Sequence, residues 1–337
     1  MSIRFAAIGI NHGHIYGICR QLMGAGAELV GFYATEPDLI QQFSETYPQA
    51  KLAESEAVLL EDPTIDLIAS SAIPDQRGPI GIRAMQHGKD YICDKPGLVS
   101  LEQLAQVRRV QAETQRIYSV FFSERFGSRS AEKLGQLLQQ GVIGEVVHME
   151  GMGPHRIGLT PRPDWFWEEA RIGGILNDIG SHQVDQYLTF SGAKDVEVVF
   201  SQVANYHHPD APTFQDFGDL ILRSPNSTAH IRVDWFSPDG LGVFGDGRIF
   251  LVGTDGYIES RAIIDIAGRP GGGHLFVVNA GGPQYIDCQD VALSYGPNII
   301  QDVLNRTETA MTQEHCFYAC ELILKAQAQA TKLGHLA

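Results

Sequence analysis

The sequence predicts two domains: a doubly wound α/β domain with a parallel sheet, then an α+β domain with a large, mostly antiparallel open sheet covered by helices on one face. Two observations support this prediction. Short apolar strands alternate with helical stretches up to about residue 122, as in a parallel sheet with helices on both faces. From Gly144 onward, apolar and polar residues alternate over long stretches between turns, as in antiparallel strands. We place the boundary after residue 123, which gives predicted domains of residues 1–123 and 124–337.

The first domain is expected to contain apolar strands joined by helices. In chain order, its strands are expected at residues 3–9, 27–33, 65–71, 90–93 and 117–122. The helices between them are expected to end near Gly24 and to cover residues 37–46, 78–87 and 100–114, the last one capped by Ser100.

The first strand runs into a glycine turn and a helix, which is the phosphate-binding start of a Rossmann-type dinucleotide fold. If Gly9 is the first glycine of the fingerprint, the second position holds Asn11 and the third holds His14. Asn11 tolerates a positive φ, so the turn can form. His14 is expected either to hold the helix and the strand further apart or to point its ring at the phosphates.

The end of the second strand usually carries an acid that binds the ribose hydroxyls of the dinucleotide. This chain has Ala34 at that position. Glu36 either reaches the adenosine ribose or is a solvated charge at the start of helix 37–46, which is the interpretation we favour. The choice between NAD and NADP therefore stays open.

Asp94-Lys95-Pro96 directly follows the strand of residues 90–93. A ligand of a parallel sheet lies beyond the carboxyl ends of the strands, and Lys95 is expected at that edge. The alternative is a surface lysine in a turn.

The second domain begins after residue 123, and its strands alternate with turns. They are expected at residues 145–152, 196–205, 217–223, 230–236, 248–253 and 257–264, with helices near 298–305 and 313–333 closing the chain. One face of this large antiparallel sheet would be exposed in a monomer and is expected to be buried against another subunit. We therefore expect a homodimer or homotetramer formed through the C-terminal sheet.

A loop that starts at Arg171 runs into a helix that ends at Gly192, and this stretch carries acid–base side chains. Asp178, His182 and Asp185 are spaced i, i+4 and i+7, so they are expected to share one helix face. That face offers a proton acceptor with carboxylates beside it. The alternative is that Asp178 only caps the helix and His182 is a surface histidine.

The charge and the cysteine pattern of the chain argue against several classes of binding partner and cellular location. A formal net charge of -15 argues against nucleic acid and anionic membranes, because binding to phosphates depends on Lys and Arg. No apolar run is long enough to cross a bilayer, and the start of the chain is too short for a signal sequence. The five cysteines are scattered without a CxxC pair, which fits reduced thiols in the cytoplasm.

Taken together, these motifs resemble the glucose-fructose oxidoreductase/inositol dehydrogenase/MocA family. The segments that carry the resemblance are Gly9, Gly88–Pro96, Ser123–Phe126, Gly141–Gly144 and Gly173–Asp185. The match in order and spacing extends to about residue 192, and beyond it only the general architecture agrees.

The resemblance implies an NAD- or NADP-dependent oxidoreductase in which Lys95, Asp178 and His182 are catalytic. This sequence departs from the family pattern at two positions. Asp94 stands where the family usually has a glutamate, and Arg77 stands where it often has a histidine. The residues expected to hold the cofactor are Gly9, Asn11, His12, Gly13, His14, Thr35, Pro74, Asp94 and Lys95.

The expected substrate is a neutral sugar or polyol. Trp165 and Trp167 precede the catalytic loop, where they either stack on a sugar ring or anchor the loop. His155 and Arg156 are further candidate substrate contacts, and Arg156 would suit a carboxylate or phosphate.

Three other functions are weighed against a dehydrogenase. A glycosidase or lyase would use a tightly held NAD for transient oxidation. A dinucleotide-binding regulator without turnover would have little use for the three catalytic side chains. A zinc enzyme could use His155, Asp178 and His182, but it would leave the glycine turn and Lys95 unexplained, so we expect no metal.

Overall fold

The computed structural model describes residues 2–159 and 161–336. The chain forms two compact units, one made of Met1–Phe121 with Ser294–Tyr318 and the other of Phe122–Leu293 with Ala319–Ala337.

The first unit is a six-stranded parallel sheet with the strand order β3-β2-β1-β4-β5-β6. Its strands are β1 (Arg4–Ile8), β2 (Glu28–Tyr33), β3 (Lys51–Leu52), β4 (Leu67–Ser70), β5 (Asp90–Asp94) and β6 (Tyr118–Phe121). The order reverses between β1 and β4, and ligands of such sheets bind at the carboxyl ends of the strands beside that reversal. This architecture confirms the predicted doubly wound domain.

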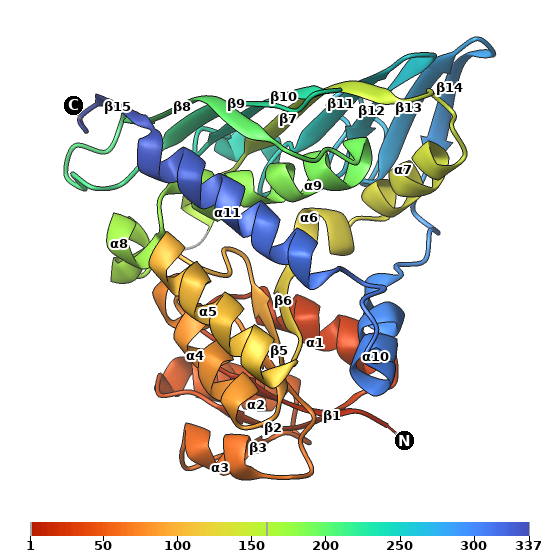
Figure 1. The fold of residues 1–337 in the computed structure, drawn as a ribbon. Helices are drawn as coiled ribbons and strands as arrows, with labels where there is room; N and C mark the ends of the chain where they lie inside the picture. The colour runs from red at the N-terminus through yellow and green to blue at the C-terminus, as the bar shows by residue number, and fades with distance from the viewer. Residues whose placement is uncertain (1, 160, 337) are drawn as a thin grey trace. The chain divides into compact units, whose positions relative to one another are not determined.

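Helices pack on this sheet (Figure 1). They are α1 (Ile15–Gly24), α2 (Pro37–Thr46), α3 (Glu56–Glu61), α4 (Pro74–Gln86), α5 (Leu101–Thr114) and α10 (Tyr295–Asn305). Helix α1 buries Ile15, Ile18, Cys19 and Leu22, whose i, i+3, i+4 and i+7 spacing places them on one face. Ser100 accepts a hydrogen bond from the Gln103 N–H, so it caps α5 as predicted.

The first unit contains elements that the sequence did not predict. β3 has two residues and α3 has six, so both are too short to show a period. Ser294–Tyr318, which we predicted as part of the second domain, belongs to the first unit instead. There, the Tyr295 hydroxyl lies 3.1 Å from the Ser119 hydroxyl, and Arg306 forms an ion pair with the buried Asp90.

The second unit is built on a nine-stranded sheet with the order β14-β13-β12-β11-β7-β10-β9-β8-β15. Its strands are β7 (Val146–Pro154), β8 (Glu197–Asn205), β9 (Phe217–Arg223), β10 (Thr228–Asp234), β11 (Arg248–Gly253), β12 (Gly256–Arg261), β13 (His274–Asn279), β14 (Gly282–Asp287) and β15 (Thr331–Gly334). The β7–β10 and β8–β15 pairs are parallel, and the other pairs are antiparallel. The predicted open, mostly antiparallel sheet is thereby confirmed.

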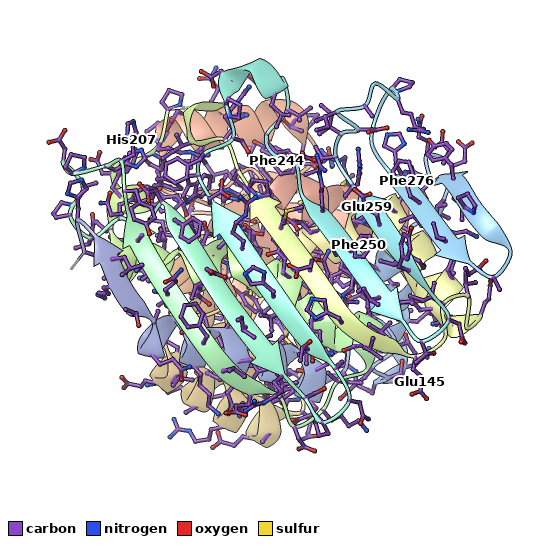
Figure 2. The ribbon with its side chains drawn as sticks, turned by 90° about the horizontal axis from the view of Figure 1, so that it is seen from above. Glu145, His207, Phe244, Phe250, Glu259 and Phe276 are labelled. Atoms are coloured by element: carbon purple, nitrogen blue, oxygen red, sulfur yellow. The ribbon has the colours of Figure 1, made fainter. Side chains whose placement is uncertain are left out.

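One face of this sheet is covered by helices (Figure 1). They include α6 (Ser123–Phe126), α7 (Arg129–Gln139), α9 (Ser181–Ser191) and the end of α11 (Gln313–Gln329), while α8 (Glu169–Ile172) lies in the connection before α9. Helix α9 packs on β7, where Gly151 and Gly153 leave room for the Gln183 side chain. On the opposite face, Figure 2 shows Phe250, Glu259 and Phe276 projecting from neighbouring strands.

Three strands of the second unit were not predicted. β13 and β14 form a hairpin around Ala280 and Gly281, a turn signal that the sequence does contain. The predicted helix 313–333 ends at Gln329, and β15 follows it. β15 pairs in parallel with β8, a contact between distant segments that local periodicity does not reveal.

The five cysteines are buried and free, as predicted. Among the residues that the structure describes, no helix combines the length and the apolar character needed to cross a bilayer.

Replacing Gly153 by alanine is expected to destabilise the protein. A Cβ atom at this position would lie 2.9 Å from Ile179 Cγ2 and 3.1 Å from Gln183 Nε2, so the helical segment above β7 would have to move. Such overpacking costs about 1–3 kcal/mol, which urea unfolding can measure. A Cβ atom at Gly135 on α7 would meet nothing within 4 Å, so Gly135→Ala should leave stability unchanged or raise it. Equal losses in both variants would contradict the packing account.

Candidate active site

Gly9 makes the tight turn that begins the nucleotide loop of the first unit. Its φ is +73°, and a Cβ atom would lie 2.5 Å from Ala72 Cβ, so no larger residue fits. The Gly9 N–H donates to the Tyr33 carbonyl, and the Gly9 carbonyl accepts from the Ser71 N–H. The turn is therefore held between the ends of β2 and β4, as a dinucleotide fold requires.

The loop after Gly9 leads to the N-terminus of α1. The N–H groups of Gly13 and His14 have no acceptor among the described residues, so they are available to a phosphate. The side chain of α1 residue Ile15 is fully buried, and the helix lies close to the sheet. Our expectation that His14 holds helix and strand further apart than a small residue would stays a prediction.

Glu36 is fixed beside this loop. Its Oε1 accepts a hydrogen bond from Asn11 Nδ2 at 2.7 Å, and its Oε2 accepts from the N–H and the hydroxyl of Thr35 at 3.2 Å. The interpretation that we favoured, a solvated charge at the start of α2, is therefore wrong. Asn11, at the position of the second glycine, links the turn to a carboxylate just after β2.

Asp94 ends β5 and is fully buried. Its Oδ1 lies 2.9 Å from His14 Nδ1, and its Oδ2 lies 3.0 Å from His12 Nδ1 and 3.2 Å from Arg77 Nη2. Burial alone would raise the pKa of Asp94, but the charges of His14 and Arg77 outweigh it, and the pKa is held well below its usual range. His14 therefore directs its Nδ1 to a carboxylate, and the expected contact of its ring with the phosphates stays a prediction.

Arg77 organises the segment that carries Lys95. It is 1% exposed and donates hydrogen bonds to the carbonyls of Ala72, Asp94, Lys95 and Pro96. The Lys95–Pro96 peptide bond is cis, and the Lys95 residue is buried. The predicted alternative of an exposed lysine in a turn is therefore wrong.

Pro74 is at the first position of α4, the helix that carries Arg77 three residues later. Its missing N–H costs nothing there, because the first N–H groups of a helix have no partner within it. Its role is to start the helix that positions Arg77, and a direct contact with the cofactor stays a prediction.

In the second unit, Asp178 and His182 lie on either side of a change in helix type. Asp178 is half-buried on the π-helical turn η3 (Leu176–Gly180), and His182 follows in the first turn of α9. His182 is 1% exposed, and its ring lies 6.5 Å from that of Phe122. Single π-helical turns are frequent at functional sites. The alternative of a surface histidine is therefore wrong.

Asp185 has a structural role. It is fully buried, and its two oxygens accept hydrogen bonds from Arg125 Nε and Nη2 at 2.6 and 2.7 Å. Next to Arg125, Glu124 accepts from Gln183 Nε2 at 2.7 Å. These contacts attach α6 to α9 and so fix the helix that carries His182.

The four predicted substrate-contact residues of the second unit have neighbours of their own. His155 donates from Nδ1 to the Gly153 carbonyl, and Arg156 donates to the Asp239 carbonyl and lies 3.6 Å from its carboxylate. The ring of Trp167 lies 4.9 Å from that of Phe214, and the ring of Trp165 lies 6.5 Å from that of Phe166. These contacts support the anchoring role for both tryptophans.

The sequence reasoning did not identify Arg162. Its guanidinium lies over the rings of Phe166 and Trp235, at 4.7 and 5.1 Å from their centres. Burial lowers the pKa of Arg162, and the charge of Asp178 opposes that shift. The charge of Asp178 therefore acts on Arg162, and no periodicity or motif marks Arg162 in the sequence.

The zinc alternative requires His155, Asp178 and His182 to converge. Within the described part of the chain, the ligand atoms of these three side chains do not form a cluster. His155 instead lies among aromatic rings, 5.5 Å from both Trp235 and Phe244.

Both units match known protein families. Residues 3–122 match the oxidoreductase family with an NAD-binding Rossmann fold, and residues 131–259 match the GFO/IDH/MocA C-terminal domain. A crystal structure from Erwinia carotovora atroseptica, named as an oxidoreductase, is 45% identical with a TM-score of 0.96. It covers 99% of this chain and 100% of its own.

Two curated relatives carry the names of dehydrogenases. The trans-1,2-dihydrobenzene-1,2-diol dehydrogenase of Xenopus tropicalis is 31% identical over 176 residues, which is 51% of each protein. The chain thus spans about half the length of that relative. The scyllo-inositol 2-dehydrogenase (NAD(+)) of Bacillus subtilis is 25% identical over 264 residues, 76% of this chain and 73% of its own length.

Replacing Asp185 by alanine is expected to destabilise the protein strongly, because it leaves the partly buried Arg125 without its carboxylate. Removing one partner of a buried ion pair costs about 3–5 kcal/mol of unfolding free energy, which denaturant unfolding can measure. The exposed Glu197–Arg223 pair is the matched control, and Glu197→Ala should cost no more than about 1 kcal/mol. Similar losses in the two variants would show that the Asp185 pair does not hold α6 to α9.

Proposed function

We propose that this chain, which belongs to the glucose-fructose oxidoreductase/inositol dehydrogenase/MocA family of NAD(P)-dependent oxidoreductases, oxidises a secondary hydroxyl of a neutral sugar, polyol or cyclic diol. Two relatives are named for the oxidation of cyclic diols or polyols, trans-1,2-dihydrobenzene-1,2-diol and scyllo-inositol. The observation that carries the proposal is Lys95, which is buried and held at the carboxyl end of β5 by Arg77 in a domain that binds a nicotinamide dinucleotide.

Each catalytic side chain has a distinct task in this reaction. His182 is the general base that removes the hydroxyl proton, and its burial keeps water away from that step. The ammonium of Lys95 stabilises the alkoxide character that develops on the same oxygen. Asp178 favours the charged form of the imidazole. A bound nicotinamide supplies the hydride acceptor.

The substrate class follows from the charges of the second unit. Arg156, which would suit an anionic substrate, is already paired with Asp239, and Arg162 faces Asp178. The nearby carboxylates reduce the attraction of each guanidinium for a carboxylate or phosphate of the substrate. This supports a substrate without a net charge.

We also propose that NAD is preferred over NADP. The carboxylate of Glu36 lies next to Asn11 at the edge of the nucleotide loop, and residues 33–38 contain no Lys or Arg. A carboxylate at this point accepts hydrogen bonds from ribose hydroxyls and repels a 2′-phosphate.

Replacing His182 by asparagine or Lys95 by methionine should each lower kcat by about 10²–10⁴, because each removes a group needed when the proton leaves. A panel of inositols, aldoses and cyclic diols with NAD supplies the assay. The double variant should lose much less than the product of the two single losses, since both side chains are proposed to act on one hydroxyl.

The controls are His87→Gln and Lys194→Met, which change exposed residues of the same types. Thermal shifts with NADH show whether each variant remains folded and binds the cofactor. A folded His182→Asn protein that turns over near the wild-type rate would remove the assignment.

Replacing Glu36 by glutamine should lower the preference for NAD. We expect the kcat/KM with NAD divided by the kcat/KM with NADP to fall roughly tenfold, an effect of about 1.4 kcal/mol. The carboxylate that repels the 2′-phosphate is lost, while the hydrogen bond from Asn11 can persist. The exposed Asp38→Asn variant, two residues along in α2, should leave the ratio unchanged. A wild-type preference for NADP, or equal effects of both substitutions, would refute the role of Glu36.

A further inference from the structure

The imidazoles of His12 and His14 share the carboxylate of Asp94 at the edge of the nucleotide loop. Their rings are edge to face, with centres 4.3 Å apart. His14 Nδ1 is hydrogen-bonded to Asp94 Oδ1 at 2.9 Å, and His12 Nδ1 lies 3.0 Å from Oδ2 without a hydrogen bond. The two histidine side chains are 31% and 38% exposed, while that of Asp94 is fully buried. One buried acceptor thus orients two accessible rings.

The hydrogen bond from His14 fixes which nitrogen of that ring carries the proton. Asp94 is ionised because its charged neighbours hold its pKa well below the usual range despite burial, and a carboxylate only accepts hydrogen bonds. The Nδ1 atom of His14 must therefore be the donor. In a neutral imidazole the other nitrogen, Nε2, is then an acceptor.

In a neutral imidazole, Nε2 cannot donate a hydrogen bond to a phosphate, because Nε2 and the phosphate oxygens are then both acceptors. The Nε2 atoms of His12 and His14 make no hydrogen bond to any described residue. The same loop supplies the N–H groups of Gly13 and His14 at the start of α1. Protonation would turn Nε2 into a charge-assisted donor at a loop that binds pyrophosphate in dinucleotide folds.

We propose that the His12–His14 pair is part of the pyrophosphate-binding site, and that one of its imidazoles takes up a proton from solvent when the dinucleotide binds. Asp94 holds the resulting imidazolium, and the pair supplies charge in a loop that lacks the second and third glycines. This inference rests on the dinucleotide-dependent function proposed above.

The surrounding charges limit the uptake to one proton for the pair. Within the first unit, Asp94 favours imidazolium, whereas Arg77 and Lys95 disfavour it, and Glu36 lies beyond Asn11. Burial, followed by the charge of His14, lowers the pKa of His12 to about 4, so His12 stays neutral and the pair takes up a single proton. A bound diphosphate adds negative charge, which raises the pKa of the imidazole beside it.

A divalent cation is the rival occupant of this cluster. His12, His14 and Asp94 are ligand types that zinc accepts. However, Asp94 already pairs with the Arg77 guanidinium, and the Lys95 charge acts on the same cluster, so a dication would meet two fixed positive charges. A pyrophosphate meets the same charges as attractions, which is why we favour the anion.

Calorimetric titration of the full chain with NADH, at one pH in buffers of different ionisation enthalpy, measures the proton uptake. At pH 7.5 we expect roughly 0.5–1 proton per NADH bound. The pKa rises on binding, so affinity is greatest at low pH and weakens by up to tenfold per pH unit as pH rises. ADP-ribose, which has the pyrophosphate but no nicotinamide, should show the same uptake.

His14→Gln should weaken NADH binding by about tenfold and remove most of the uptake. His12→Gln should leave the uptake largely intact, and His87→Gln should behave like wild type. If a loop variant does not fold, the wild-type uptake still decides the question.

Three results would overturn the proposal. The first is NADH binding without proton uptake and with no effect of His14→Gln, which leaves the dehydrogenase function intact. The second is tight Zn²⁺ binding that His12→Gln abolishes, with NADH affinity lowered by EDTA, which would make the cluster a metal site. The third is no binding of NADH or NADPH at any pH, which would reject the proposed function as well.

Discussion

The site in the first unit depends on one buried ion pair, Arg77 with Asp94. A buried carboxylate must be paired or it becomes protonated, and a buried guanidinium must find acceptors for its five N–H donors. Arg77 satisfies both requirements. It forms an ion pair with the Asp94 carboxylate and donates hydrogen bonds to the carbonyls of Asp94, Lys95 and Pro96. The positions of Lys95, His12 and His14 follow from that pairing. The replacement of the family's histidine by Arg77 is therefore coherent with the change of the family's glutamate to Asp94.

In the second unit, the corresponding constraint is steric. Gly151 and Gly153 let η3 and α9 lie against β7, and the Asp185–Arg125 pair fixes α9 from the side of α6. His182 is buried because its helix is held on both sides. The loops and the π-helical turn before it can then place Asp178 near Arg162. A rigid sheet thus carries the acid–base groups, while the segment that precedes them is irregular.

Much of this fold could be predicted, because the strands of the first unit are apolar runs bounded by glycine and proline. β9 and β11 were predicted to the residue, because their alternation is regular. The errors have physical causes. Ser294–Tyr318 and β15 are placed by contacts across the chain, which leave no local period. Among the proposed site residues, Lys95 and His182 stand in motifs, whereas Arg162 is defined by the rings it stacks on and by the charge of Asp178. Glu36 was misjudged because its partner, Asn11, is 25 residues away.

The chain passes from one unit to the other three times, after Phe121, Leu293 and Tyr318. A ribosome releases the first unit's sheet early, yet Tyr295 and Arg306, which contact Ser119 and Asp90, emerge only after strands β7 to β14 of the second unit have been made. The nucleotide-binding half therefore reaches its final packing late in translation, although most of its sequence comes first. For the same reason, transplanting this half into another protein requires three junctions, and a fragment that stops at residue 123 would lack Tyr295 and Arg306.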